Sequence, residues 1–156
     1  EQSIRKGFAT VSETTGLQGR WQKITSNPTL ICDTGHNVEG ITEVVKQLRN
    51  TPHHQLHIIF GVVNDKDITG ILQLLPKNAI YYFTKPQIER ALDEKELKQK
   101  ANAVALKGES YPSVELALNK ARADSLESDL IFVGGSSFMV ADLLTLIKSR
   151  KIDFML

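Results

Sequence analysis

The 156-residue sequence lacks several features that would point to a specialised class of protein. A single cysteine, Cys32, excludes an internal disulfide framework. The apolar runs are short, as in Leu56–Phe60, and fall well below the roughly 18 residues of a membrane span. Nineteen Lys and Arg residues nearly balance 18 Asp and Glu residues, so no excess charge favours a nucleic acid or an anionic membrane. We therefore expect a soluble, cytoplasmic protein that binds neither nucleic acids nor membranes.

Several catalytic signatures are also missing. The sequence contains no GxxxxGK[ST] phosphate loop, no GxSxG elbow and no GxGxxG fingerprint, which argues against a self-contained kinase, hydrolase or dehydrogenase. The histidines His53, His54 and His57 lack the cysteine or acidic companions of a metal site, so we expect no metal-binding residues. Cys32 ends an apolar run, which favours a buried core position over a nucleophile.

Short apolar runs alternate with amphipathic stretches along the chain. In one such stretch, Ile41, Val44, Val45 and Leu48 have the spacing that places them on one face of a helix. Strands are expected at Thr29–Cys32, Leu56–Phe60, 79–83, 103–106 and 130–133. Strands separated by helices predict β-α-β crossovers. The sequence thus predicts an α/β fold, a three-layer Rossmann-like domain with a mainly parallel sheet of five to six strands.

Three turns rich in small or polar residues follow expected strands, at 33–37, 61–67 and 134–137. Each precedes an expected helix, whose unpaired N–H groups favour anions. In open α/β sheets, ligands bind outside the carboxyl ends of the strands. We therefore expect Asp33, Gly61 and Gly135 to lie at one edge of the sheet and to form a ligand site.

Five polar residues in or near these turns are candidates for binding, and each also has a structural explanation. Asp33 can accept hydrogen bonds from ribose hydroxyls, or it can cap its own turn. His36 can stack on a base or donate to an anion, or it can simply fill a turn. Asn37 and Ser136 suit helix N-caps, although Ser136 can also hold a carboxylate or phosphate. Arg20 can reach phosphates with two parallel hydrogen bonds, or it can be a surface cation.

Four segments together resemble a known family. They are Gly16-Leu17-Gln18-Gly19-Arg20-Trp21-Gln22, the DxxHN core Asp33-Thr34-Gly35-His36-Asn37, the 61–67 turn and Gly135-Ser136-Ser137-Phe138. In this order they resemble the carboxy-terminal domain of folylpolyglutamate synthase/dihydrofolate synthase, within the Mur ligase superfamily. The sequence departs from the common pattern at Val38, where many relatives have proline, and at Gly35, which is often alanine.

The resemblance implies an ATP-dependent ligase that joins the amino group of L-glutamate to a carboxylate of a folate or of dihydropteroate. ATP first phosphorylates the carboxylate, and the amine then attacks the acyl phosphate. Carried over to this sequence, Arg20, Asp33 and Asn37 bind ATP, Arg20 through its phosphates and Asp33 through its ribose. His36 is a catalytic residue and, with Ser136, binds glutamate. The implied cofactors are ATP and Mg²⁺, with the Mg²⁺ ligands in an amino-terminal ATPase domain.

The resemblance also implies how the chain is divided. Residues 1–17 match the junction between two domains, and residues 18–156 match the carboxy-terminal domain. The expected partner is the protein's own amino-terminal ATPase domain, and we expect the present chain to be inactive alone. Two alternatives stay open at this point. One is the equivalent domain of a UDP-muramoyl-peptide ligase, and the other is a stand-alone module that binds a nucleotide or anion without catalysis.

Overall fold

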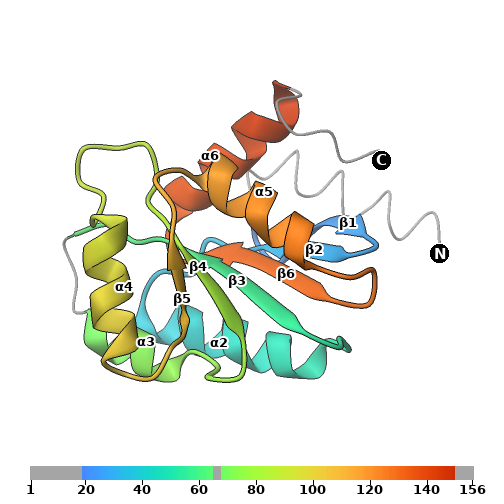
Figure 1. The fold of residues 1–156 in the computed structure, drawn as a ribbon, viewed down its shortest axis with the longest axis horizontal. Helices are drawn as coiled ribbons and strands as arrows, with labels where there is room; N and C mark the ends of the chain where they lie inside the picture. The colour runs from blue at the N-terminus through green and yellow to red at the C-terminus, as the bar shows by residue number, and fades with distance from the viewer. Residues whose placement is uncertain (1–18, 65–67, 150–156) are drawn as a thin grey trace.

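The computed structural model describes residues 19–64 and 68–149, so the expected junction at 1–17 lies outside the described residues. The described residues form a six-stranded sheet with the order β1-β2-β6-β3-β4-β5 (Figure 1). The strands are β1 Gln22–Ser26, β2 Thr29–Cys32, β3 Leu56–Phe60, β4 Ile80–Phe83, β5 Gly108–Ser110 and β6 Leu130–Gly134. The helices are α2 Val38–Asn50, α3 Ile68–Leu74, α4 Glu94–Asn102, α5 Val114–Asp124 and α6 Ser137–Lys148. In these ranges, no helix is long and apolar enough to cross a membrane.

Helices cover both faces of the sheet, with α2, α3 and α4 on one face and α5 and α6 on the other (Figure 1). Strand β3 shows why both faces need cover, because all five of its residues are buried and successive side chains point to opposite faces. Ile58 and Phe60 pack in the core under α2, α3 and α4, whereas Ile59 packs under α5 and α6. Strand β1 pairs antiparallel with β2, and the other four pairings of the sheet are parallel. The predicted three-layer α/β fold is confirmed.

The strand expected at 103–106 is wrong. Helix α4 continues to Asn102, and the chain then turns through Ala105, whose φ of 65° lies in the left-handed region. The N–H of Leu106 donates to the carbonyl of Ala101 at 3.0 Å, which closes the helix end. Leu106 is buried in the core beside that helix end, so its apolar character serves the end of a helix. The strand β5 begins two residues later, at Gly108.

The strand order brings three strand ends together at one edge of the sheet. Strand β6 lies between β2 and β3, and the three run parallel. The helices after β2 and β3 lie on one face, whereas α6, which follows β6, lies on the other (Figure 1). The N–H of Asp33 donates to the carbonyl of Val133 at 3.2 Å, and the N–H of Gly61 donates to that of Gly134 at 3.3 Å. The predicted meeting of the three turns is confirmed, at the place where ligands bind in such folds.

Candidate functional site

Asp33 begins the turn after β2, and the residue is buried, with 7% of its surface exposed. One carboxylate oxygen, Oδ2, accepts the N–H of Trp21 at 2.8 Å, and the other, Oδ1, accepts the N–H of Gly35 at 2.7 Å. Asp33 therefore caps its own turn, and it also binds the backbone of the segment before β1, twelve residues away in the sequence. A carboxylate has about four lone-pair sites, so capacity for a further hydrogen bond remains.

Arg20 lies in a tight turn that precedes β1. Gly19 has a φ of 87°, and a Cβ there would lie 2.6 Å from the Cγ1 atom of Val140, so glycine is required on both grounds. The Gly19 N–H donates to Gln22 Oε1 at 2.8 Å, and the Gly19 carbonyl accepts the Thr34 N–H at 2.9 Å. The side chain of Arg20 is exposed. It therefore projects from a turn that is tied to the end of β2.

His36 and Asn37 lead into helix α2. Asn37 is the N-cap, as predicted, and its Oδ1 accepts the N–H of Gly40 at 2.8 Å. The His36 ring is exposed, and its Nδ1 lies 3.2 Å from the carbonyl of Thr34. In the neutral tautomer that donates from Nδ1 to this carbonyl, Nε2 carries the lone pair. This nitrogen can accept a proton from a ligand at the edge.

Ser136 caps the next helix of the edge, α6. Its Oγ accepts the N–H of Phe138 at 3.1 Å, and the residue is 3% exposed. Gly135, just before it, has a φ of 105°, and a Cβ at this position would collide with the carbonyl of Gly61. Glycine therefore allows the turns after β6 and β3 to approach each other. The predicted N-cap is confirmed, and the hydroxyl proton of Ser136 has no acceptor within residues 19–64 and 68–149.

The connection from β4 to α4, residues 84–93, also reaches this edge, although no sequence motif predicted that it belongs to the site. The Asn64 N–H donates to the Arg90 carbonyl at 2.7 Å, which attaches the connection to the turn after β3. The N–H of Gln87 donates to Asp142 of α6 at 2.7 Å. The Arg90 guanidinium lies 6.0 Å from the centre of the Phe138 ring, beside the start of α6. Residues 65–67 of the expected 61–67 turn lie outside the described ranges.

These elements make the edge suitable for anions. Helices α2 and α6 both begin here, so backbone N–H groups and the positive ends of two helix dipoles are placed beside the turns. Two arginines add guanidinium groups: Arg20 from the turn before β1, and Arg90 from the connection after β4. Ser136 and Asn37 add side-chain hydrogen-bond donors. Such a set can bind phosphates and carboxylates together.

Two further sequence expectations concern residues outside the edge. Burial, with a smaller contribution from Asp33, raises the pKa of the Cys32 thiol to about 12, which makes Cys32 a core residue and a poor nucleophile. Across residues 19–64 and 68–149, no group of three or more His, Cys, Asp or Glu can hold a metal ion.

His57 lies near the amino end of β3, in a buried network that the sequence did not reveal. Its Nε2 is 2.9 Å from Asp129 Oδ2, and its Nδ1 is 2.9 Å from the Tyr82 hydroxyl. Burial opposes ionisation of Asp129, but hydrogen bonds from the Leu126 N–H, from His57 and from the Gln55 N–H outweigh it. Together they hold the pKa of Asp129 below its usual range. The network joins β3 and β4 to Asp129, the residue before β6.

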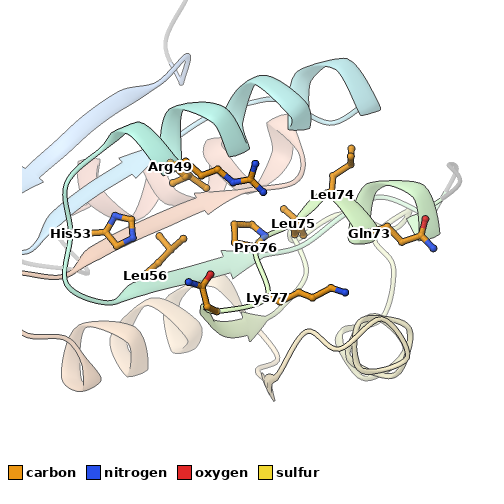
Figure 2. A pocket seen from close by; sticks show the side chains of 10 residues that line it. Arg49, His53, Leu56, Gln73, Leu74, Leu75, Pro76 and Lys77 are labelled. Carbon is orange, nitrogen blue, oxygen red and sulfur yellow. The ribbon is translucent and has the colours of Figure 1, made fainter.

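A cavity of about 460 Å³, whose lining Figure 2 shows, lies at the end of the sheet where β3 begins. This end is opposite to the three turns, which follow the ends of β2, β3 and β6. The cavity is lined by the last turns of α2 and α3 and by the start of β3, with Leu56 and Pro76 among its apolar residues. Arg49, His53 and Lys77 also line it. None of the five candidate residues lies in this cavity. The five candidate residues therefore place the candidate site at the polar edge and not in this cavity.

A family model described as Mur ligase, glutamate ligase domain matches residues 19–137. The chain belongs to this Mur ligase family. The match begins at the Arg20 turn and ends at the start of α6, and it includes all five candidate residues. The expected resemblance to the Mur ligase superfamily is confirmed.

Relatives of known name refine this assignment. The Mur ligase domain is 28% identical over 159 residues to a dihydrofolate synthase/folylpolyglutamate synthase of Buchnera aphidicola subsp. Schizaphis graminum, covering 97% of this chain and 36% of the relative. It is 29% identical over 154 residues to the Escherichia coli protein of the same name, covering 97% and 34%. The solved structure of E. coli FolC in complex with DHPP and ADP matches with a TM-score of 0.78 at 26% identity, covering 86% of this chain and 32% of that chain. The chain thus spans about a third of the length of these relatives.

Proposed function

We propose that this Mur ligase domain is the carboxy-terminal part of an ATP-dependent ligase that adds L-glutamate to a folate or to dihydropteroate. The observation that carries the proposal is the convergence of Arg20, the 33–37 turn and Ser136 at one sheet edge with two helix starts. The names of the relatives, and the ADP and DHPP in the E. coli FolC structure, support the same activity. The partner would be an ATPase domain of the same protein.

The reaction explains why such an edge is needed. A carboxylate is a poor electrophile, so its oxygen first attacks the γ-phosphorus of ATP, and ADP leaves. The amine of glutamate then attacks the acyl carbon, phosphate leaves, and the amine loses a proton as the amide forms. The first step brings two anions together, so cations and fixed N–H groups must reduce their repulsion.

Arg20, Asp33 and Asn37 are assigned to ATP. The exposed guanidinium of Arg20 can bind phosphate oxygens with two parallel hydrogen bonds. Asp33 retains acceptor capacity for a ribose hydroxyl after its two backbone contacts. The Oδ1 atom of Asn37 caps α2, so the amide NH₂ of this side chain is the group left to donate to the nucleotide.

His36 and Ser136 are assigned to glutamate. With Nδ1 donating to the Thr34 carbonyl, Nε2 of His36 can accept the proton that the attacking amine must lose. Ser136 can donate its hydroxyl proton to a carboxylate of glutamate, and the start of α6 adds backbone N–H groups there. In this assignment His36 is the catalytic residue and Ser136 orients the substrate.

Mg²⁺ accompanies ATP in this type of chemistry, but the described part of this chain does not fit it, because it offers no cluster of ligating side chains. We assign the metal ligands to the ATPase domain and derive no step of the reaction from the metal. The 156-residue chain alone should therefore release no ADP.

Substrate dependence tests the proposal. The complete protein that contains this chain is given MgATP and L-glutamate with dihydropteroate, tetrahydrofolate or a UDP-muramoyl peptide, and ADP release is measured. We expect release with dihydropteroate, with tetrahydrofolate or with both. Release with the UDP-muramoyl peptide alone would reassign the domain to a peptidoglycan-precursor ligase. ATP binding without turnover on any acceptor would instead indicate a binding module.

A further inference from the structure

Trp21, the residue after Arg20, has a backbone conformation that bulky residues rarely adopt. Its φ is 42°, in the left-handed region, and the φ of Gly19 on the other side of Arg20 is 87°. Glycine accepts such a conformation without cost, but tryptophan does not. Contacts elsewhere in the molecule must therefore hold Trp21 in place.

Two contacts do so. The N–H of Trp21 donates to Asp33 Oδ2 at 2.8 Å. The indole packs against the core under α2, α3 and α4, and its ring centre lies 6.2 Å from that of Phe132 in β6. Asp33 is itself fixed, because its other oxygen accepts the Gly35 N–H at 2.7 Å and its own N–H donates to Val133 at 3.2 Å.

Arg20 is thus held on both sides. The carbonyl of Gly19 accepts the N–H of Thr34 at 2.9 Å, and Trp21 is bound to Asp33, so both neighbours of Arg20 are attached to the turn after β2. The Arg20 side chain, by contrast, is exposed, and no hydrogen bond or ion pair joins it to another residue of the described ranges. Because the backbone of residue 20 is already fixed, it has little conformational freedom left to lose when Arg20 binds a ligand.

We propose that Trp21, together with Asp33, is a positioning residue that orients Arg20 toward the phosphates of the nucleotide. The proposal rests on the proposed function for the role of Arg20. In this proposal Asp33 helps to orient Arg20 in addition to its assigned contact with the ribose. Trp21, which is not among the residues assigned to binding, also orients Arg20. The central consequence of the proposal is that the effect of Trp21 on catalysis passes through Arg20.

A double-mutant cycle in the complete protein tests this consequence. Trp21→Ala should lower kcat/KM for ATP about tenfold or more and should change kcat as well as KM, as Arg20→Ala does. In the Arg20→Ala background, Trp21→Ala should change kcat/KM less than twofold. Trp21→Phe, which keeps an aromatic ring against Phe132, should restore most of the activity. Leu97→Ala, in the buried face of α4, is the control that lowers thermal stability without this kinetic change.

A second measurement does not depend on activity. In the 156-residue chain, Trp21→Ala and Asp33→Ala should lower the backbone ¹⁵N heteronuclear NOE of residue 20, whereas Leu97→Ala should not. Unchanged order at residue 20, or losses of activity that multiply in the double variant, would overturn the positioning role. A complete protein without ligase activity would overturn the proposed function instead, and the NOE data would still decide whether Trp21 and Asp33 fix Arg20.

Discussion

Polar side chains at the candidate site take part in folding as well as in the proposed binding. Asp33 accepts two backbone N–H groups, Asn37 caps α2, and Ser136 caps α6. These backbone groups need partners at turns and helix starts whether or not a ligand is bound. A loss of activity after substitution must therefore be separated from a loss of stability.

Arg20 is the candidate least involved in folding, because its side chain is exposed. In the complete protein, Arg20→Ala should raise the KM for ATP and lower kcat, together by about 2–4 kcal/mol, since charge on the phosphates changes during transfer. Arg20→Lys should recover part of this loss, because an ammonium group cannot reproduce two parallel hydrogen bonds. The measurement is the ATP dependence of the rate at saturating glutamate and acceptor.

Arg49→Ala is the matched control, since Arg49 is an exposed arginine on α2 at the opposite end of the sheet. It should leave both kinetic constants within about twofold, or under 0.5 kcal/mol. If Arg20→Ala also stays within that limit, Arg20 is a surface cation and does not bind the phosphates.

Asp129 gives a prediction about pH and stability. Because its pKa is lowered in the folded protein, its contribution is complete above its ordinary pKa of about 4 and is lost as the pH falls through the lower, folded value. Asp129→Asn should lower the free energy of unfolding at pH 7 by roughly 1–3 kcal/mol and make its fall between about pH 5 and pH 2 less steep.

Urea unfolding at a series of pH values measures this effect. Glu127→Gln, an exposed carboxyl group in the same loop, should leave the pH dependence as in the wild type. A slope for Asp129→Asn that equals the wild-type slope would show that the buried network does not depend on the ionised carboxylate.

At the scale of elements, the sequence predicts best where burial forces a continuous apolar run. Strands β2 and β3 have the bounds that their apolar runs predict, because both faces of each are covered. The apolar run at 103–106 predicted a strand wrongly, because Leu106 is buried at the end of helix α4 and not in a strand. Strand β1 was not expected, since it lies at the sheet edge and has no fully buried residue to mark it.

The sequence predicted which turns form the candidate site, but it did not predict the hydrogen bonds that connect them. The turns containing Asp33 and Ser136 follow from strand ends and polar residues, and the parallel sheet brings them together. The hydrogen bond from Trp21 to Asp33 joins residues twelve apart through a left-handed turn, which no local pattern encodes. The connection at 84–93 reaches the edge through backbone hydrogen bonds to Val62 and Asn64, which are independent of side-chain identity.

A comparison of two helix N-caps separates the effect of Ser136 on stability from its effect on glutamate binding. Ser136 caps α6 at the site, and Ser113 caps α5 through a similar hydrogen bond to the N–H of Leu116 at 3.2 Å. Ser136→Ala and Ser113→Ala should each lower the free energy of unfolding by about 1 kcal/mol. In the complete protein, only Ser136→Ala should raise the KM for glutamate. Equal KM values in the two variants would remove Ser136 from the glutamate site.

At the scale of the whole molecule, the proposed function requires the described domain to supply one side of a site that an ATPase domain would complete. The described domain offers guanidinium groups and helix starts, but its sequence has no phosphate loop to surround the phosphates of ATP. The 156-residue chain should therefore bind ATP with a Kd in the high-micromolar to millimolar range, roughly 4–6 kcal/mol. Calorimetry checks this value, and nanomolar binding would favour a stand-alone nucleotide-binding module.

The fate of the carboxylate oxygens of the acceptor tests the proposed ligase most directly. The complete protein is given MgATP, L-glutamate and an acceptor labelled with ¹⁸O in the carboxylate that becomes the amide. If the carboxylate is phosphorylated first, the bridging oxygen leaves with phosphate when the amine attacks. We predict one ¹⁸O atom in inorganic phosphate for each ADP released and each amide formed. Label in AMP, or unlabelled phosphate accompanying the amide, would contradict an acyl phosphate and with it the proposed reaction.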